Sequence, residues 1–276
     1  MGSSRAMKLD VILSTFDTTP AELVEAVRVA EEAGFAGAWI YDHLAGEAMG
    51  HERALEVWSM LGAIAASTRT IEIGPMVTNV TVRHPGITAV AAATVQQLSG
   101  GRLNLGVGAG SGPESQYASE VLMLGMTPLG AGPRRRMVAE GVELMRAIWR
   151  GRGDLEGEYF SLRGARTFLR PDVTPRIIIG ANGPRMAALA GRVGDGVNLH
   201  SYETDLEGLL GVARRAASEA GREDFLLTVE QPYAPAYLDP GSEEHRHYAD
   251  MGVDRLVLTV PAPHLRVLTE ARDLNR

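Results

Sequence analysis

The sequence of 276 residues contains no cysteine. This absence excludes disulfide bonds, cysteine-ligated zinc, iron–sulfur clusters and thiol nucleophiles. It fits a reducing compartment, and we expect a cytoplasmic protein.

Long apolar stretches are also missing, since no run reaches the roughly eighteen apolar residues that a transmembrane helix needs. The opening residues, MGSSRAM, lack the apolar core of a secretory signal peptide. We interpret residues 1–6 as a tag or disordered tail. Residues 7–276 are expected to form one domain, because no Pro- or Ser-rich linker divides them.

An excess of positive charge is absent too. The chain has 27 Lys and Arg against 34 Asp and Glu, which gives a net charge of −7. Nucleic acids and anionic membranes are bound through basic patches, so neither is an expected partner. We expect a small-molecule substrate. Carboxylates are not clustered and no HExxH pair occurs, so no metal site is predicted.

Short apolar runs alternate with helical patterns along the whole chain. The predicted strands are 9–14, 37–42, 71–77, 103–108, 176–181, 195–200, 226–230 and 255–260. The predicted helices are about 20–33, 53–67, 85–99, 134–150, 184–193, 205–220, 242–251 and 262–273. Eight such units predict an α/β fold, a single (β/α)8 TIM barrel, with an open doubly wound sheet as the alternative. The long connections 109–133 and 152–175 are predicted insertions around the fourth helix.

Polar residues follow the predicted strands, where a barrel of this kind carries its active site. His43 is the best acid–base candidate, and Asp42 or another carboxylate could fix its tautomer. The alternative is that Asp42 caps the next segment and His43 only packs.

Glycines, 32 in all, also gather at strand ends. The stretch GVGAGSGPE (106–114) fails the dinucleotide fingerprint because its third glycine is Pro113. It is either a backbone surface for a flat ligand or a tight turn.

Asn182 and Gly183 precede a predicted helix start, which suggests a phosphate site, plain N-capping by Asn182, or both. Arg83-His84-Pro85 is interpreted as a helix cap, and Arg134-Arg135-Arg136 as the opening of the fourth helix.

Several motifs together resemble the luciferase-like flavin- and deazaflavin-dependent oxidoreductases. They are EEAGFAGAWIYDHL (31–44), IGPMVTNVTVRHP (73–85), AAATVQQLSGGRLNLGVGAG (91–110), RRRMVAEGVELMRAIWRG (134–151), EGEYFSLRGAR (156–166) and IIIGANGPRMAALAGRVGDGV (177–197). The resemblance implies a (β/α)8 barrel, frequent homodimers and hydride transfer. It is closest to the coenzyme F420 branch, with FMN-dependent monooxygenases and non-catalytic flavin- or deazaflavin-binding members as alternatives.

The resemblance also assigns residues. His43 would be catalytic, and a non-proline cis peptide would lie at Met76–Val77. The implied cofactor contacts are Asp42, Met76, Val77, Thr78, Asn79, Gly108, Ala109, Gly110, Ala181, Asn182 and Gly183. The positional candidates for substrate contacts are Ser14, Ser111, His200 and Glu230. F420-dependent glucose-6-phosphate dehydrogenases carry a tryptophan and an acidic residue where this chain has Glu47 and Ser111, which argues against a sugar-phosphate substrate.

Overall fold

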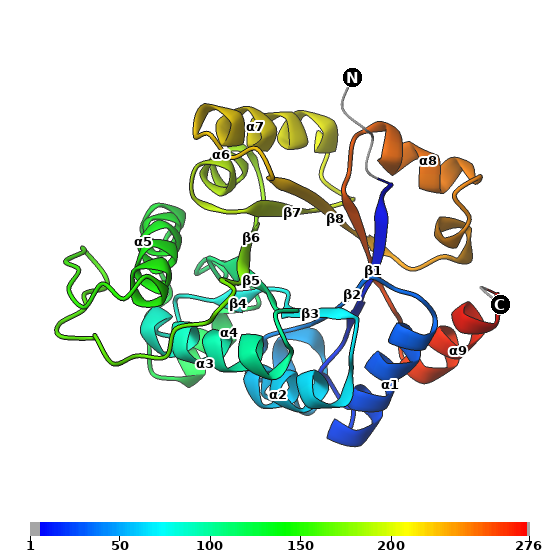
Figure 1. Ribbon diagram of the computed structural model, residues 1–276, viewed down its shortest axis with the longest axis horizontal. Helices are drawn as coiled ribbons and strands as arrows, with labels where there is room; N and C mark the ends of the chain where they lie inside the picture. The colour runs from blue at the N-terminus through cyan, green and yellow to red at the C-terminus, as the bar shows by residue number, and fades with distance from the viewer. Residues whose placement is uncertain (1–5, 275–276) are drawn as a thin grey trace.

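The computed structural model describes residues 6–274 and shows parallel strands arranged as a barrel inside a ring of helices (Figure 1). The strands are β1 (Lys8–Leu13), β2 (Gly37–Ile40), β3 (Glu72–Pro75), β4 (Thr78–Asn79), β5 (Asn104–Gly108), β6 (Arg176–Gly180), β7 (Gly196–His200), β8 (Leu226–Pro232) and β9 (Arg255–Thr259). β1 pairs in parallel with β9, placing Asp10 opposite Val257. This pairing, together with the bridge between Ile73 and Leu103 that joins the two ends of the strand order, confirms the predicted TIM-type barrel and rules out the open sheet. Residues 1–5 of the predicted tail lie outside the described residues.

The third predicted strand, 71–77, is interrupted rather than continuous. β3 ends at Pro75 and β4 begins at Thr78, and the intervening Met76–Val77 peptide is cis, as the resemblance implied. β3 reaches the fifth strand through a bridge between Ile73 and Leu103, while β4 pairs with β5 directly. The nine strand segments therefore correspond to eight barrel positions.

The helices follow the predicted order with shifted ends. The α-helices are α1 (Pro20–Glu32), α2 (Val57–Ser67), α3 (Pro85–Leu98), α4 (Ala118–Met123), α5 (Ala131–Trp149), α6 (Pro184–Val193), α7 (Leu206–Glu219), α8 (Glu243–Asp250) and α9 (His264–Leu274), and the 3-10 turns are η1 (Glu47–Met49) and η2 (Pro235–Leu238). α2 begins four residues later than predicted because Glu56, not residue 53, is its N-cap and accepts the Ser59 amide. α5 begins at Ala131, so Arg134 lies inside the helix rather than opening it.

Local capping explains why these segments are helical. α1 has the full capping box: Thr19 accepts the amide of Glu22, and the Glu22 carboxylate accepts the amide of Thr19. α3 begins after His84, whose ring accepts the Gly86 amide. The predicted capping role of the Arg83-His84-Pro85 segment is therefore carried by His84.

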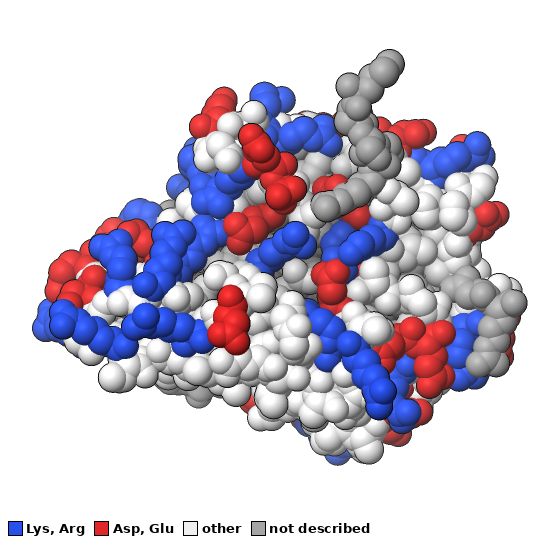
Figure 2. All heavy atoms as spheres, in the orientation of Figure 1, with Lys and Arg blue, Asp and Glu red and all other residues white. Residues whose placement is uncertain are grey.

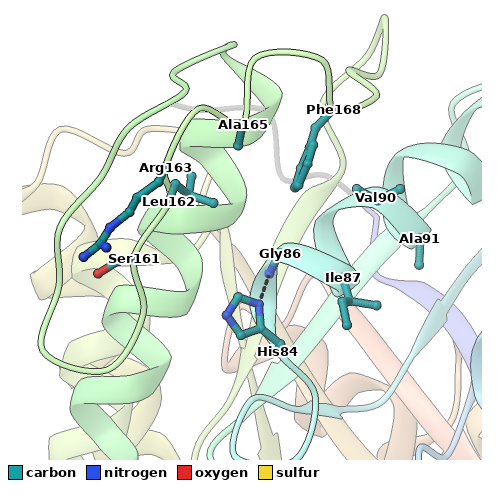
Figure 3. A pocket seen from close by; sticks show the side chains of 10 residues that line it. All are labelled: His84, Gly86, Ile87, Val90, Ala91, Ser161, Leu162, Arg163, Ala165 and Phe168. Carbon is teal, nitrogen blue, oxygen red and sulfur yellow. Dashed lines mark hydrogen bonds between the residues drawn. The ribbon is translucent and has the colours of Figure 1, made fainter.

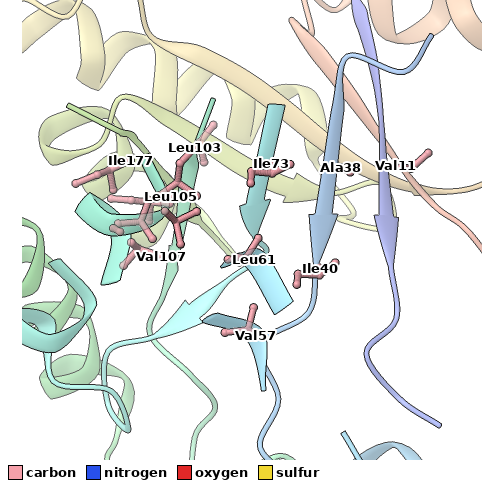
Figure 4. Packing of buried hydrophobic residues seen from close by; sticks show 14 of the residues in the cluster. Val11, Ala38, Ile40, Val57, Leu61, Ile73, Leu103, Leu105, Val107 and Ile177 are labelled. Carbon is pink, nitrogen blue, oxygen red and sulfur yellow. The ribbon is translucent and has the colours of Figure 1, made fainter. Parts of the chain in front are cut away.

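Apolar side chains fill two separate layers. The larger layer lies between the strands and the helices, where Val57 and Leu61 of α2 pack with Ile40 and Ile73 (Figure 4). The smaller layer forms a separate cluster on the strands: Ile12, Trp39, Met76, Ile178, Leu226 and Val257. Burying both faces of the strands explains their near-continuous apolar sequences.

The amino end of the barrel is closed by buried charges. Arg255 donates to both carboxylate oxygens of Asp10 at 2.7 and 2.8 Å, and to Glu72 at 2.7 Å. The indole of Trp39 also donates to Asp10. The helices succeed one another clockwise in Figure 1, and with right-handed crossovers this means that Figures 1 and 2 view the amino end.

The long connection 152–175 projects beside α5 and α3 (Figure 1). Glu140 of α5 holds it by accepting the backbone amides of Glu158, Tyr159 and Phe160. Between this connection and α3 lies an outer cavity of about 590 Å³, bordered by Ile87 and Phe168 (Figure 3). No helix in the described part of the chain combines the length and apolarity needed to cross a membrane.

Candidate active site at the carboxyl ends of the strands

Residues predicted for the site lie at the carboxyl ends of the strands or just beyond them. Asp42 and His43 follow β2, the 76–79 segment ends the third barrel position, and residues 108–110 end β5. Ala181, Asn182 and Gly183 follow β6. Ser14 follows β1, His200 ends β7, and Glu230 lies in β8. The topology therefore brings these candidates to one end of the barrel.

His43 is paired with a glutamate that the sequence reasoning did not identify. Its Nδ1 lies 3.1 Å from Oε1 of Glu120, and the same oxygen accepts the amides of Leu44 and Ala45 at 2.9 and 3.1 Å. Burial alone would raise the pKa of Glu120, but the hydrogen bonds from His43 and these amides outweigh it and hold the pKa below its usual value. Glu120 is therefore an ionised carboxylate beside the ring.

The carboxylate that faces His43 is therefore not that of Asp42, one of the two possibilities considered from the sequence. The Asp42 side chain is instead held by Arg83, through bonds of 2.8–3.1 Å to both carboxylate oxygens, and by the Thr78 hydroxyl at 2.5 Å. Arg83 also pairs with Glu56 at 2.9 Å. These bonds tie the end of β2 to β4 and to the start of α2.

Aromatic rings surround the imidazole of His43. The rings of Phe16, Tyr117 and Tyr41 lie with centroids 5.3, 5.7 and 6.2 Å from it. Phe16 also stacks on His51. The acid–base candidate thus sits between apolar ring surfaces, and its side chain remains 24% exposed.

Glu230 organises a second polar group at the same end of the barrel. Its Oε1 accepts from the hydroxyls of Tyr41 and Thr259, both at 3.3 Å. Its Oε2 lies 3.6 Å from Nδ1 of His200, so the structure brings these two candidates together. Burial first, and then the charge of Glu230, raise the pKa of the Tyr41 hydroxyl well above its ordinary value, so Tyr41 stays a neutral donor.

Glycines of β5 and β6 leave room for Val77. A Cβ added at Gly108 would lie 2.3 Å from a methyl of Val77, and one at Gly180 would lie 3.1 Å from its other methyl. Gly110 has a φ of +62°, and its Cβ would collide with the Asn79 amide. Gly108 and Gly110 are therefore needed for packing around residues 77–79, whatever else they contact.

The start of α6 is capped by backbone alone. Gly183, at φ +81°, is the N-cap, and no side chain accepts a bond from the first turn. The predicted N-capping by Asn182 is wrong, because Asn182 lies one residue before the cap, where its side chain does not reach these amides. Ala181, by contrast, is buried and bonds to Asn198 in β7.

Two basic residues have roles that the sequence did not indicate. Arg134 donates to the carbonyls of Ala109, Gly110 and Leu129, so it supports the loop after β5. Arg83 holds Asp42 rather than capping α3. Ser14 accepts the amide of Phe16, which orders the turn after β1.

Within residues 6–274, no three His, Asp or Glu side chains are arranged to hold a metal ion.

Glu120 escaped prediction because it belongs to α4, a helix of six residues inside the connection 109–133. No repeating apolar pattern marks so short a helix. The available signal was a single charge, Glu120, within the otherwise uncharged segment ASEVLML. That signal does not indicate which residue the charge meets.

The fold and the site define a TIM-type barrel with acid–base residues at the carboxyl ends of its strands. Comparison with known proteins identifies the family: the model of the family described as "luciferase-like monooxygenase" matches residues 7–273. The chain belongs to this family, and the resemblance inferred from its motifs is confirmed.

Curated relatives include dehydrogenases and a reductase. The F420-dependent glucose-6-phosphate dehydrogenase of Beutenbergia cavernae is 35% identical over 240 residues, which cover 83% of this chain and 69% of that protein. The 5,10-methylenetetrahydromethanopterin reductase of Archaeoglobus fulgidus is 35% identical over 243 residues, which cover 87% of this chain and 67% of that protein.

Solved structures share the fold at lower identity. An F420-dependent secondary alcohol dehydrogenase in complex with an F420–acetone adduct superposes with a TM-score of 0.74 at 22% identity, covering 98% of this chain and 90% of that one. An EDTA monooxygenase from a Chelativorans species has a TM-score of 0.79 at 13% identity, covering 98% and 93%.

Proposed function

We propose that this protein is an oxidoreductase that transfers hydride between coenzyme F420 and a small organic substrate. The observation that carries the proposal is the His43–Glu120 pair at the carboxyl end of the barrel, in a chain without cysteine. Such a site can move a proton but has no redox-active thiol. The name of the Beutenbergia cavernae relative, an F420-dependent dehydrogenase at 35% identity, supports F420 as the carrier of electrons.

The residues at the barrel mouth suit a deazaflavin. A planar ring needs a close, uncharged surface, and we assign that surface to Val77, which packs over Gly108 and Gly180. A phosphate-bearing tail needs free amides, and the first turn of α6 has no side-chain cap. We assign Thr78, Asn79, Ala109 and Ala181–Gly183 to the same cofactor surface.

His43 would handle the proton in this reaction. When bound, F420 would supply the two-electron step as hydride at C5 of its ring. In alcohol oxidation, Nε2 of His43 would accept the hydroxyl proton, and in the reverse direction it would return it. Asp42 contributes by fixing the end of β2 through Arg83, and Ser111, His200 and Glu230 would face the substrate.

The decisive experiment titrates the purified protein with F420 and with FMN side by side. We expect F420 to bind, with its fluorescence quenched, and reduced F420 to be oxidised without oxygen consumption when a substrate is present. Binding of reduced FMN with oxygen uptake, and no affinity for F420, would overturn the proposal in favour of a monooxygenase. A binding protein without catalysis would bind F420 equally well with His43→Ala and show no turnover with any alcohol or ketone.

We also propose that the protein forms a homodimer through α2 and α3. These adjacent helices contain no Asp, Glu, Lys or Arg, and the surface over them in Figure 2 is mostly uncharged. Ile87 of α3 is 73% exposed beside the outer cavity of Figure 3. A second copy is the occupant proposed, because an uncharged face can pair with itself without opposing like charges.

Light scattering tests the dimer directly. Ile87→Asp is expected to shift the molar mass toward the monomer. Leu274→Asp, at an exposed position of α9, is the matched control and should leave the mass unchanged. A monomeric wild-type chain would refute the dimer.

The cytoplasmic location stays a prediction that cell fractionation of the native host would test.

A further inference from the structure

We propose that Glu120 is the positioning residue of His43. Its carboxylate fixes the ring as the Nδ1–H tautomer and leaves Nε2 as the nitrogen that exchanges protons with the substrate. The kinetic consequence rests on the proposed function, whereas the tautomer is a property of the protein alone.

The geometry around Oε1 of Glu120 is the first support. Three donors converge on this oxygen: Nδ1 of His43 and the amides of Leu44 and Ala45, all within 3.1 Å. Glu120 is only 7% exposed. Its bonds to the two amides prevent the carboxylate from turning away, so the ring has one fixed partner.

Elementary hydrogen-bond chemistry then sets the tautomer. An ionised carboxylate has no proton to donate, so the nitrogen that faces it must carry one. Nδ1 is therefore the N–H of the neutral ring, and Nε2 is left with its lone pair. The structure gives Nε2 no bond to any described side chain, although the ring is partly exposed.

A second contact from the same segment supports this role. Tyr117 lies three residues before Glu120, and its ring packs 5.7 Å from that of His43. The 117–120 segment thus supplies both the hydrogen-bond acceptor and one wall of the ring. Phe16 provides another wall from the end of β1. These contacts restrict rotation of the imidazole about its own axis.

The alternative is that Glu120 only holds the backbone of residues 44–45 in place. The chain contains a residue that serves as a control for this alternative. Glu140 likewise accepts from three N–H groups, the backbone amides of residues 158–160, but none of its described hydrogen bonds involves a histidine. If holding its loop in place were the whole function of Glu120, Glu120→Gln and Glu140→Gln would have the same kcat. If positioning is the function, only substitutions at Glu120 alter His43.

The direct test is nitrogen NMR of the full-length protein labelled at its 7 histidines, without cofactor. His43→Gln assigns the His43 signals. In the wild type, Nδ1 is expected to have the shift of a protonated nitrogen and Nε2 that of an unprotonated one. Glu120→Ala should abolish this preference, whereas Glu120→Gln, whose oxygen can still accept, and Glu140→Gln should retain it. An unchanged tautomer in folded Glu120→Ala would overturn the proposal.

Kinetics provide the second readout, and it stands even if Glu120→Ala fails to fold. Glu120→Gln removes the charge that stabilises the protonated ring, so kcat should fall roughly 10–100-fold. The KM for F420 should stay within about threefold, because the residue acts through His43 rather than on the cofactor. An unchanged kcat for Glu120→Gln would refute positioning. A wild type with the expected tautomer but no F420 activity would refute the proposed function alone.

Discussion

The two ends of this barrel use buried charge in opposite ways. At the amino end, Asp10 is fully buried, Arg255 is 3% exposed, and their pairing is complete and bidentate. At the carboxyl end, His43 and His200 stay partly exposed, and each has one ring nitrogen beside a carboxylate and one without a described partner. The charges at the amino end are fully paired, whereas each histidine at the carboxyl end keeps one ring nitrogen without a described partner.

The comparison shows where function and stability can be separated. Conservation of structure at the amino end of such a barrel serves stability, and residues at the carboxyl ends of the strands serve chemistry. Substitutions at the two ends should therefore affect different measurements. The predictions below test that separation, beginning with the largest effect.

His43→Ala should lower kcat with F420 by about 10²–10⁴-fold, because it removes the proposed general acid–base. The thermal midpoint should change little, since the ring is partly exposed. His84→Ala is the matched control: it removes the α3 cap and should cost about 1 kcal/mol of stability while leaving kcat unchanged. Equal losses of kcat in both variants would contradict the separation.

Arg255→Met should have the reverse effect. It leaves the Asp10 carboxylate buried and unpaired, which is expected to cost about 3–5 kcal/mol in urea denaturation. The kcat of the fraction that remains folded should match the wild type. Adding Asp10→Leu should recover part of the stability, because the uncompensated charge is then gone. A loss of kcat in folded Arg255→Met would show that the two ends are coupled.

Gly108→Ala tests the packing of the carboxyl end. The new methyl would meet Val77 at 2.3 Å, so we expect a loss of about 1–3 kcal/mol. Val77→Ala in the same chain should restore much of it, since it removes the opposing methyl. Additive losses in the double variant would show that the two side chains do not meet.

Glu31→Gln affects the amino end, where Glu31 holds the segment that leads into β3, and it should have the smallest effect. Burial opposes ionisation of Glu31, but the amides of Ile71, Thr70 and Arg69 outweigh it and lower its pKa to about 2. Because this pKa is depressed from 4.5, the stabilisation is present above pH 4.5 and is lost as pH falls toward about 2. Glu31→Gln should cost about 1–2 kcal/mol at neutral pH and nearly nothing at the acid end of that range. A pH-independent difference between the two proteins would contradict this assignment.

Most of the fold followed from local sequence patterns. Strands covered on both faces have near-continuous apolar runs, and capping residues such as Thr19 mark helix starts within a few positions. The interruption at Met76–Val77 was available only through the family resemblance, because nothing in the apolar pattern of 71–77 indicates a break.

The site was predicted less completely, for a geometric reason. Asp42 and His43 are adjacent in the sequence, and adjacent side chains of an extended chain point in opposite directions. The Asp42 carboxylate therefore pairs with Arg83, whereas the His43 ring pairs with Glu120. The actual partner, Glu120, is 77 residues away. Nothing local in the sequence encodes such a meeting, which depends on how the 109–133 connection folds over the barrel mouth.

The pairing of Asp10 with Arg255 has a consequence for the protein while it is being synthesised. The two residues are separated by 245 positions, so nearly the whole chain must emerge before the first strand finds the cation that neutralises it. A chain that stops before residue 255 leaves the Asp10 carboxylate without the Arg255 guanidinium that neutralises it. We expect truncated products to stay unfolded and to be degraded, which gives the cell a built-in check on completeness.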